Sequence, residues 1–121
     1  EAAIEKTSEA YINWIMELDE FMPWEQFLFE SKNPAAEQIL YVTYPSNRGG
    51  YHVKAVPDKL GSFGMRQAFP EAWAGKRDEE LEKISGVEGA TFCHSAKFLC
   101  AAKDKQSAKM LAYKSGSRYP L

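Results

Sequence analysis

The strongest structural signal in the chain is the segment Ile39-Leu40-Tyr41-Val42-Thr43-Tyr44-Pro45-Ser46-Asn47-Arg48-Gly49-Gly50-Tyr51-His52-Val53-Lys54-Ala55-Val56. Two runs rich in β-branched and aromatic residues, 39–44 and 51–56, flank a turn that contains proline, asparagine and two glycines. Strand-forming runs on either side of such a turn predict a β-hairpin. Pro57 lacks a backbone donor and is expected to end the second strand.

A second hairpin is predicted from residues 90–93 and 98–101, with the turn at 94–97. A turn at the midpoint places Cys93 opposite Cys100 and His94 opposite Leu99. Cross-strand cysteines are close enough for a disulfide in principle. Two small apolar side chains packed in the sheet are the more common arrangement, and we expect that one.

Shorter helices are predicted between the hairpins and before the first one. Residues 2–11 have a helical spacing of apolar side chains, and Pro23 suits the first turn of a short helix through residue 29. A single helical turn is expected at residues 70–73. Residues 31–36 and 58–67 lack periodicity and are predicted to be loops.

Two capped helices are predicted in the second half of the chain. One runs from Asp78 to a glycine stop at Gly86, and the other runs from Asp104 to about residue 113, with Gly116 as its stop. Their inward side chains are predicted to be Leu81, Ile84, Ala108, Leu111 and Ala112.

The chain has 121 residues and a net charge of −2, values that fit one globular domain. That charge excludes a strongly basic nucleic-acid binder and a long acidic tail. Its distribution is uneven, because residues 1–38 carry two basic and nine acidic side chains, whereas residues 39–121 carry thirteen and eight. The last stretch, from His94, holds six basic residues and one acid. This asymmetry predicts an anionic partner for the basic end.

Several other classes are excluded or disfavoured. No apolar run is long enough to cross a membrane, and no signal peptide opens the chain. The start at Glu1 suggests a piece of a longer protein. Cys93 and Cys100 are too few for a disulfide framework and are interpreted as reduced intracellular thiols.

No catalytic set can be assembled from the sequence. His52 and His94 are the only imidazoles, and the adjacent Cys93-His94 pair points to opposite faces of a strand, so it cannot close on one ion. Phosphate loops, nucleophile elbows and dinucleotide fingerprints are absent. A metal-dependent hydrolytic centre needs converging carboxylates and imidazoles, which this chain cannot readily supply.

Weaker signals concern binding. His94 lies at the mouth of the second hairpin, where a binding role and a satisfied core or edge histidine are equal alternatives. The turn 100–104 leads into a helix N-terminus that suits phosphate, but without a glycine this signal is weak, and the alternative is an ordinary connection with solvated lysines. Arg66 and Arg77 could be exposed cations or members of ion pairs. Six aromatic side chains have stacking chemistry available, and most of the six are assigned to the core: Trp24, Phe27, Phe29, Phe63, Phe69 and Trp73.

Several segments, in order along the chain, resemble one known family. They are Met22-Pro23-Trp24-Glu25-Gln26-Phe27-Leu28-Phe29, Val53-Lys54-Ala55-Val56-Pro57, Phe69-Pro70-Glu71-Ala72-Trp73-Ala74-Gly75-Lys76-Arg77-Asp78-Glu79-Glu80-Leu81 continuing to Ile84-Ser85-Gly86-Val87, and the hairpin from Phe92 and His94 through Phe98 to Lys103. The Pro-Glu-Ala-Trp block is the most specific. These segments are similar to the melanocyte-proliferating-gene (Myg) family of the DHH phosphoesterase superfamily.

The resemblance implies a C-terminal, DHH-associated domain that helps to bind substrate. Eukaryotic members are described as 3′-to-5′ RNA exonucleases of mitochondria and nucleus, and a bacterial member would be cytoplasmic. The catalytic domain, with its divalent, manganese-type metal centre, lies outside this chain, so no cofactor is expected here. The implied partners are that domain and single-stranded RNA or a short oligonucleotide, with a homo-oligomer possible and no membrane.

The resemblance also names binding residues and one departure. The implied substrate contacts are His94, Phe98, Ala101, Ala102, Lys103 and Arg66. The family's hairpin has glycines where this chain has Cys100 and Ala101, which we expect to crowd the surface and to weaken phosphate contact through the backbone. Residues 15–18, ambiguous between helix and strand, are favoured as a strand.

The prediction is therefore an α/β fold with a mixed, largely antiparallel sheet of about five strands flanked by helices. Its favoured function is substrate binding for a metal-dependent exonuclease, inactive by itself. The rival is an assembly module that docks to the catalytic domain, or to a second copy, without touching substrate. An independent small enzyme is the least favoured reading.

Overall fold

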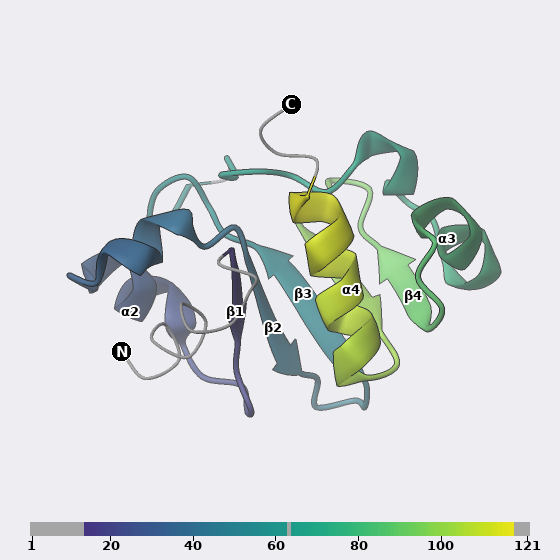
Figure 1. The fold of residues 1–121 in the computed structure, drawn as a ribbon, viewed down its shortest axis with the longest axis horizontal. Coiled ribbons are helices and arrows are strands. Elements are labelled where there is room, and N and C mark those ends of the chain that lie inside the picture. The colour runs from purple at the N-terminus through teal and green to yellow at the C-terminus, as the bar shows by residue number, and fades with distance from the viewer. Residues whose placement is uncertain (1–13, 63, 118–121) are drawn as a thin grey trace.

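The computed structural model describes residues 14–62 and 64–117. A five-stranded sheet with the order β1-β2-β3-β5-β4 forms its centre (Figure 1). Its strands are β1 (Ile15–Glu17), β2 (Tyr41–Pro45), β3 (Tyr51–Ala55), β4 (Ala90–Cys93) and β5 (Leu99–Ala102). Only the β1–β2 pairing is parallel, so the predicted mixed, largely antiparallel α/β sheet is confirmed.

Both predicted hairpins are present, and β1 confirms the strand expected near residue 15. The helices are α2 (Trp24–Glu30), α3 (Asp78–Ser85) and α4 (Lys105–Gly116), with 3₁₀ turns η1 (Pro34–Gln38) and η2 (Glu71–Trp73). Among the described residues no helix is long and apolar enough to span a bilayer. The helix predicted at residues 2–11 lies outside the described residues.

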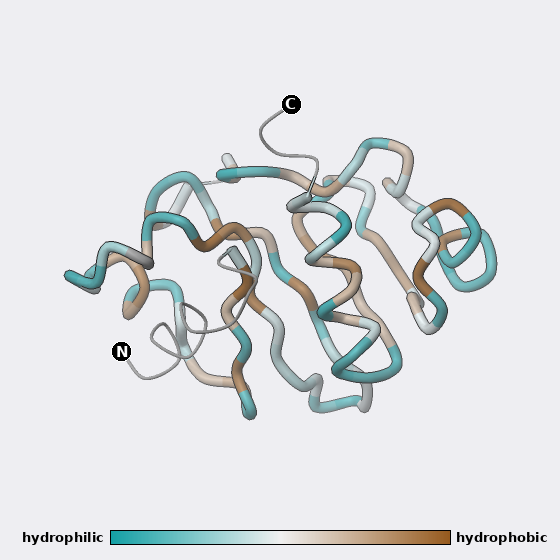
Figure 2. The backbone as a smooth tube through the Cα atoms, viewed as in Figure 1, coloured by the Kyte–Doolittle hydropathy of each residue, from teal (hydrophilic) through white to brown (hydrophobic). Residues whose placement is uncertain are grey.

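Helices cover the two faces of the sheet unequally. Helix α4 packs across one face, where alternate residues such as Tyr41, Val53 and Cys100 join Leu111 in a buried core. Helix α2 and η1 cover the other face only near β1 and β2, around Met16 and Val42. Figure 2 shows hydrophobic stretches in the sheet and also in α3 and α4, whereas the start of α4 is hydrophilic.

The structure corrects two predictions about helix ends. Asp78 does not cap α3: the N-cap is Arg77, which stays extended because it forms an isolated β-bridge with Phe92, and Asp78 begins the helix with a φ of 48°. Gly116 does not stop α4 but is its last residue, lying against the indole of Trp14. The Asp104 cap is confirmed, because its Oδ1 accepts the amide of Ser107 at 2.7 Å.

Two further predictions about packing are wrong. The loop expected at residues 31–36 is partly helical, because Pro34 begins η1 and the amide of Ala36 reaches the carbonyl of Asn33. Ile84 is exposed rather than inward. The buried positions of α3 are Leu81 and Ser85, which are four residues apart and share one stripe of the helix.

Candidate functional site

The part of the sheet that the helices leave uncovered is the candidate site. The side chains of His52, Phe92 and Ala101 on this side are half-buried. On the opposite side of the same strands Val53, Cys93 and Cys100 are buried under α4. Cross-strand pairing aligns His52 with Ala101 and Ala101 with Phe92 in one row. We call this surface the open face and define it by the residues His52, Lys54, Phe92, His94, Phe98, Leu99 and Ala101.

The rings of the second hairpin form a cluster on the open face. His94 lies 4.6 Å from the ring centre of Phe98 and 6.1 Å from that of Phe92. The Nδ1 atom of His94 accepts the backbone amide of Ala96 at 2.9 Å. A neutral His94 therefore carries its proton on Nε2, which can donate to a ligand oxygen.

Small and cationic side chains lie beside this ring cluster. The guanidinium of Arg77 lies 4.9 Å from the ring centre of Phe92, and Arg77 is exposed. Ala101 lies between Phe92 and His52 in this row, and its small side chain leaves a shallow depression between the two rings. Exposed aromatic faces next to cations are the chemistry with which proteins stack the bases of single-stranded nucleic acids.

A pocket of about 410 Å³ adjoins the cluster at the Ala55 end of β3. Phe98 forms one wall, and Lys54 and Glu25 lie at its rim, where the ammonium and carboxylate are 2.9 Å apart. The volume is within the usual range for small-molecule sites. Beside the ring cluster, the open face therefore continues into a concave pocket with a mostly apolar lining.

The structure separates Lys103 from His94. His94 lies opposite Leu99 at one end of β5, and Lys103 follows Ala102 at the other end. Four strand residues, about 13 Å, separate the two positions. The amide of Lys103 already donates to the carbonyl of Gly89, so this turn offers an anion the exposed Lys103 ammonium rather than that amide.

Arg66 makes contacts of a structural kind. Its Nη1 donates to the carbonyls of Ala36 and Ile39, both at 2.8 Å, and its guanidinium lies 5.1 Å from the ring centre of Phe29. Burial lowers the pKa of Arg66, partly offset by Glu37. These contacts tie η1 to the segment after β3, and no described contact links Arg66 to His94.

The residues that replace the family's glycines lie on different faces. Cys100 is buried under α4 beside Cys93, so it does not crowd the open face as the sequence suggested; only Ala101 adds a methyl group there. Strand alternation explains the difference. Ala102 also faces the core, and both cysteines are free buried thiols. Burial raises the pKa of Cys100.

The fold pairs charges that the sequence separates. The Nζ atom of Lys105 lies 3.7 Å from the Oδ1 atom of Asp19, and the Nζ atom of Lys109 lies 3.4 Å from the Oε2 atom of Glu17. Part of the basic end is therefore balanced by the acidic first third of the chain. The cations that sequence analysis missed or left undecided are Lys54 and Arg77, and the alternation of Lys54 with Val53 could have placed Lys54 on the open face.

The described residues contain no group of three or more histidine, cysteine, aspartate or glutamate side chains that could hold a metal ion. Stacking, hydrogen bonding and charge recognition are the chemistry that this arrangement offers.

Comparison with known proteins gives one consistent result. A family model, MYG1_exonuc, described as an uncharacterised protein family (UPF0160), matches residues 1–115. The chain is 39% identical over 108 residues to a MYG1 protein of Dictyostelium discoideum, covering 88% of this chain and 33% of the relative. It is 33% identical over 92 residues to the MYG1 exonuclease of Homo sapiens, and this match covers 74% of this chain and 24% of the relative.

The chain thus spans about a third or less of the length of these curated relatives. No solved structure matches it.

Proposed function

The chain belongs to the MYG1 exonuclease family, and on that premise we propose that it is the substrate-binding module of a metal-dependent 3′-to-5′ exonuclease. Its ligand is single-stranded RNA or a short oligonucleotide, held on the open face. The human relative is named an exonuclease, which supports a nucleic-acid substrate. The observation that carries the proposal is the cluster of Phe92, His94 and Phe98 on an uncovered sheet.

Each member of the cluster has a distinct task in this proposal. Phe92 and Phe98 stack bases, and His94 donates from Nε2 to a phosphate or base oxygen. Lys103, about 13 Å along β5, meets a different phosphate of the same strand. Arg77 supplies a cation beside Phe92. Ala101 forms the low floor between the stacking positions.

Hydrolysis is assigned to the part of the parent protein outside this chain, where a divalent, manganese-type metal centre would lie. The chain alone is then a binding module without hydrolytic activity. In the described residues only two histidines are present: His52 lies in β3, and His94 directly follows β4.

The proposal is tested by fluorescence anisotropy of a labelled hexauridylate RNA titrated with the chain at several salt concentrations. His94→Ala and Phe98→Ala are each expected to weaken binding about tenfold, through loss of a hydrogen bond or a stacking contact. Lys103→Ala is expected to weaken binding and to lower the salt slope by about 1.

The matched control is Lys114→Gln, which removes an exposed charge from α4 on the opposite side of the sheet. It should leave affinity unchanged. Absence of RNA binding at low salt would overturn the proposal, as would His94→Ala and Phe98→Ala variants that are folded and bind like the parent chain.

Docking to the rest of the parent protein, or to a second copy, is a second candidate function. Helix α3 favours it because it exposes Ile84, with 46% of the side chain accessible, on an otherwise acidic helix. Light scattering measures the solution mass of the chain. A dimer that Ile84→Glu dissociates, together with unchanged RNA binding in the His94→Ala variant, would favour this alternative.

A further inference from the structure

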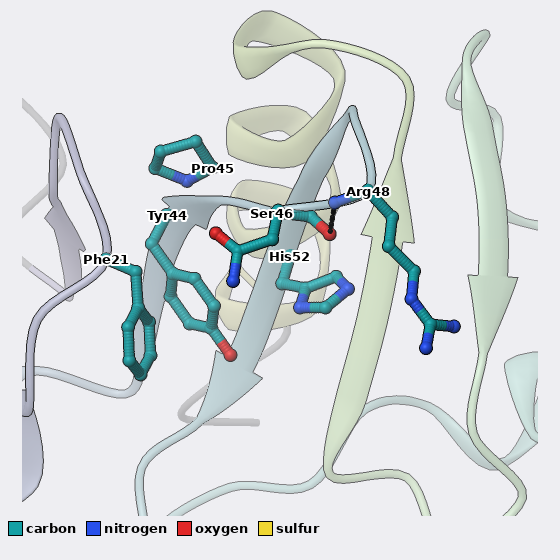
Figure 3. A pocket seen from close by; sticks show the side chains of 7 residues that line it. Phe21, Tyr44, Pro45, Ser46, Arg48 and His52 are labelled. Atoms are coloured by element: carbon teal, nitrogen blue, oxygen red, sulfur yellow. Dashed lines mark hydrogen bonds between the residues drawn. The ribbon is translucent and has the colours of Figure 1, made fainter.

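A second pocket lies at the other end of the open face, beside the turn of the first hairpin (Figure 3). Its volume is about 380 Å³. Tyr44 and His52, which are cross-strand partners on β2 and β3, form its floor. Phe21 borders Tyr44 on one side, and Arg48 extends from the turn on the other.

The walls of this pocket are aromatic. The ring centre of Phe21 lies 5.2 Å from that of Tyr44, and the rings meet edge to face. Tyr44 lies 5.6 Å from His52, again edge to face. Phe21 is 58% exposed, so its ring is accessible at the edge of the pocket. A flat ligand ring can stack on such a side chain and bury its exposed apolar surface.

Polar groups converge on the same pocket. Asn47 and Arg48 are exposed on the turn and line the pocket. The turn is anchored, because Ser46 Oγ accepts the amide of Arg48 and the amide of Ser46 donates to the carbonyl of Gly50. A side-chain amide can pair with a base edge, and a guanidinium pairs with phosphate. Within the described residues, Arg48 has no carboxylate in salt-bridge distance.

The turn also approaches Lys103. A Cβ added to Gly50 would lie 2.6 Å from the carbonyl oxygen of Ala102 and 3.7 Å from the Cα of Lys103. The end of β5 and the first hairpin turn are therefore in contact. Two cationic residues, Arg48 and Lys103, border the same end of the open face.

We propose that this pocket binds one nucleobase of a single-stranded nucleic acid, stacked on Phe21 above the floor of Tyr44 and His52, with its base edge at Asn47 and its phosphate at Arg48. The inference rests on the proposed function and deepens it. The row Tyr44–His52–Ala101–Phe92 joins the pocket to the ring cluster through successive cross-strand pairs. One strand of RNA thus crosses the sheet from His94 to the first hairpin turn.

The first experiment maps binding by NMR on the ¹⁵N-labelled chain, with uridine monophosphate and hexauridylate as separate probes. Hexauridylate is expected to shift the amide signals of Asn47, Arg48 and His52 together with those of His94 and Phe98. If it shifts the signals of residues 94–98 and leaves those of 47–52 unchanged, the pocket is overturned and the proposed function stands.

Other outcomes separate the two proposals further. If uridine monophosphate shifts the signals of residues 47–52 and no RNA shifts those near His94, the pocket stands and the ring cluster loses its role. If neither probe shifts any signal at low salt, both proposals fail.

The second experiment uses variants with a matched control. Phe21→Ala is expected to weaken hexauridylate binding about tenfold, through loss of one stacking surface, and Arg48→Gln to weaken it and reduce its salt dependence. Phe27→Ala removes an exposed phenylalanine of α2 that does not line the pocket, and it should bind like the parent chain. Equal affinities for Phe21→Ala and Phe27→Ala would contradict the assignment.

Discussion

The indole of Trp14 lies directly over Gly116, and its Nε1 donates to the carbonyl of Ala112 at 3.4 Å. A Cβ at Gly116 would overlap that indole ring. Gly116→Ala is therefore expected to lower the free energy of unfolding by about 1–3 kcal/mol through overpacking. Urea denaturation followed by tryptophan fluorescence or circular dichroism measures the change.

A double-mutant cycle isolates this contact. Trp14→Ala destabilises the fold by itself, but it opens the space above Gly116. In that background Gly116→Ala should cost little, because alanine is the better helix former. An equal cost in both backgrounds would show that the indole is not the cause.

The first hairpin turn supplies a second stability prediction. Gly50 has a φ of 74°, and a Cβ there would lie 2.6 Å from the carbonyl oxygen of Ala102. Gly49 has a φ of 93° and nothing within 4 Å of such a Cβ. Both alanine variants meet backbone strain of about 1 kcal/mol, and Gly50→Ala adds a backbone clash of roughly 1–3 kcal/mol. Thermal denaturation compares them, and Gly49→Ala should melt at the higher temperature.

Asp104 predicts a pH dependence. Hydrogen bonding to Ser107 lowers the pKa of Asp104 below its usual value of 3.8, so the ionised carboxylate stabilises the folded state. The contribution is fully present above pH 3.8 and is lost as the pH falls through the lower folded-state pKa. Asp104→Ala should reduce the urea midpoint at pH 7, with a difference from the parent chain that shrinks in acid.

Asp104→Asn is the matched variant, because an asparagine oxygen also accepts the Ser107 amide. The urea midpoint of Asp104→Asn at pH 7 should be close to that of the parent chain. If the Asp104→Ala deficit stays constant down to pH 2, the carboxylate is not the source of the stabilisation.

Variants of Arg66 test whether this residue stabilises the fold or binds substrate. Its two hydrogen bonds to carbonyls of the η1 segment predict that Arg66→Ala lowers the free energy of unfolding by about 2 kcal/mol. Arg66→Lys keeps the charge but loses the planar stacking on Phe29. If the role is structural, Arg66→Lys destabilises the fold without changing RNA affinity. If a folded Arg66→Lys variant binds RNA more weakly, the result would support the phosphate contact that the family resemblance implies.

Local sequence signals were sufficient for much of the fold. The turn of Pro45 and Gly50 determines the first hairpin, and Asp104 marks the start of α4, because both depend on backbone conformation and on hydrogen bonds between near neighbours. The parallel pairing of β1 was not predictable in this way. It depends on Ile15 meeting Tyr41, a contact between segments that no short pattern connects.

The candidate site was predicted less completely. His94 and Phe98 come from one hairpin, so their proximity followed from its register. Arg66 and Phe29 come from distant segments, and nothing local indicated their contact. The charge asymmetry is partly offset in the fold for the same reason: Lys109 and Glu17 are far apart in sequence and adjacent in the structure.

The amide of Ala96 holds the His94 ring in place before any ligand arrives. A side chain oriented in advance loses little rotational freedom on binding, so the entropic cost of complex formation falls. If His94 binds the proposed ligand, the turn after β4 therefore contributes to affinity by fixing the ring before binding.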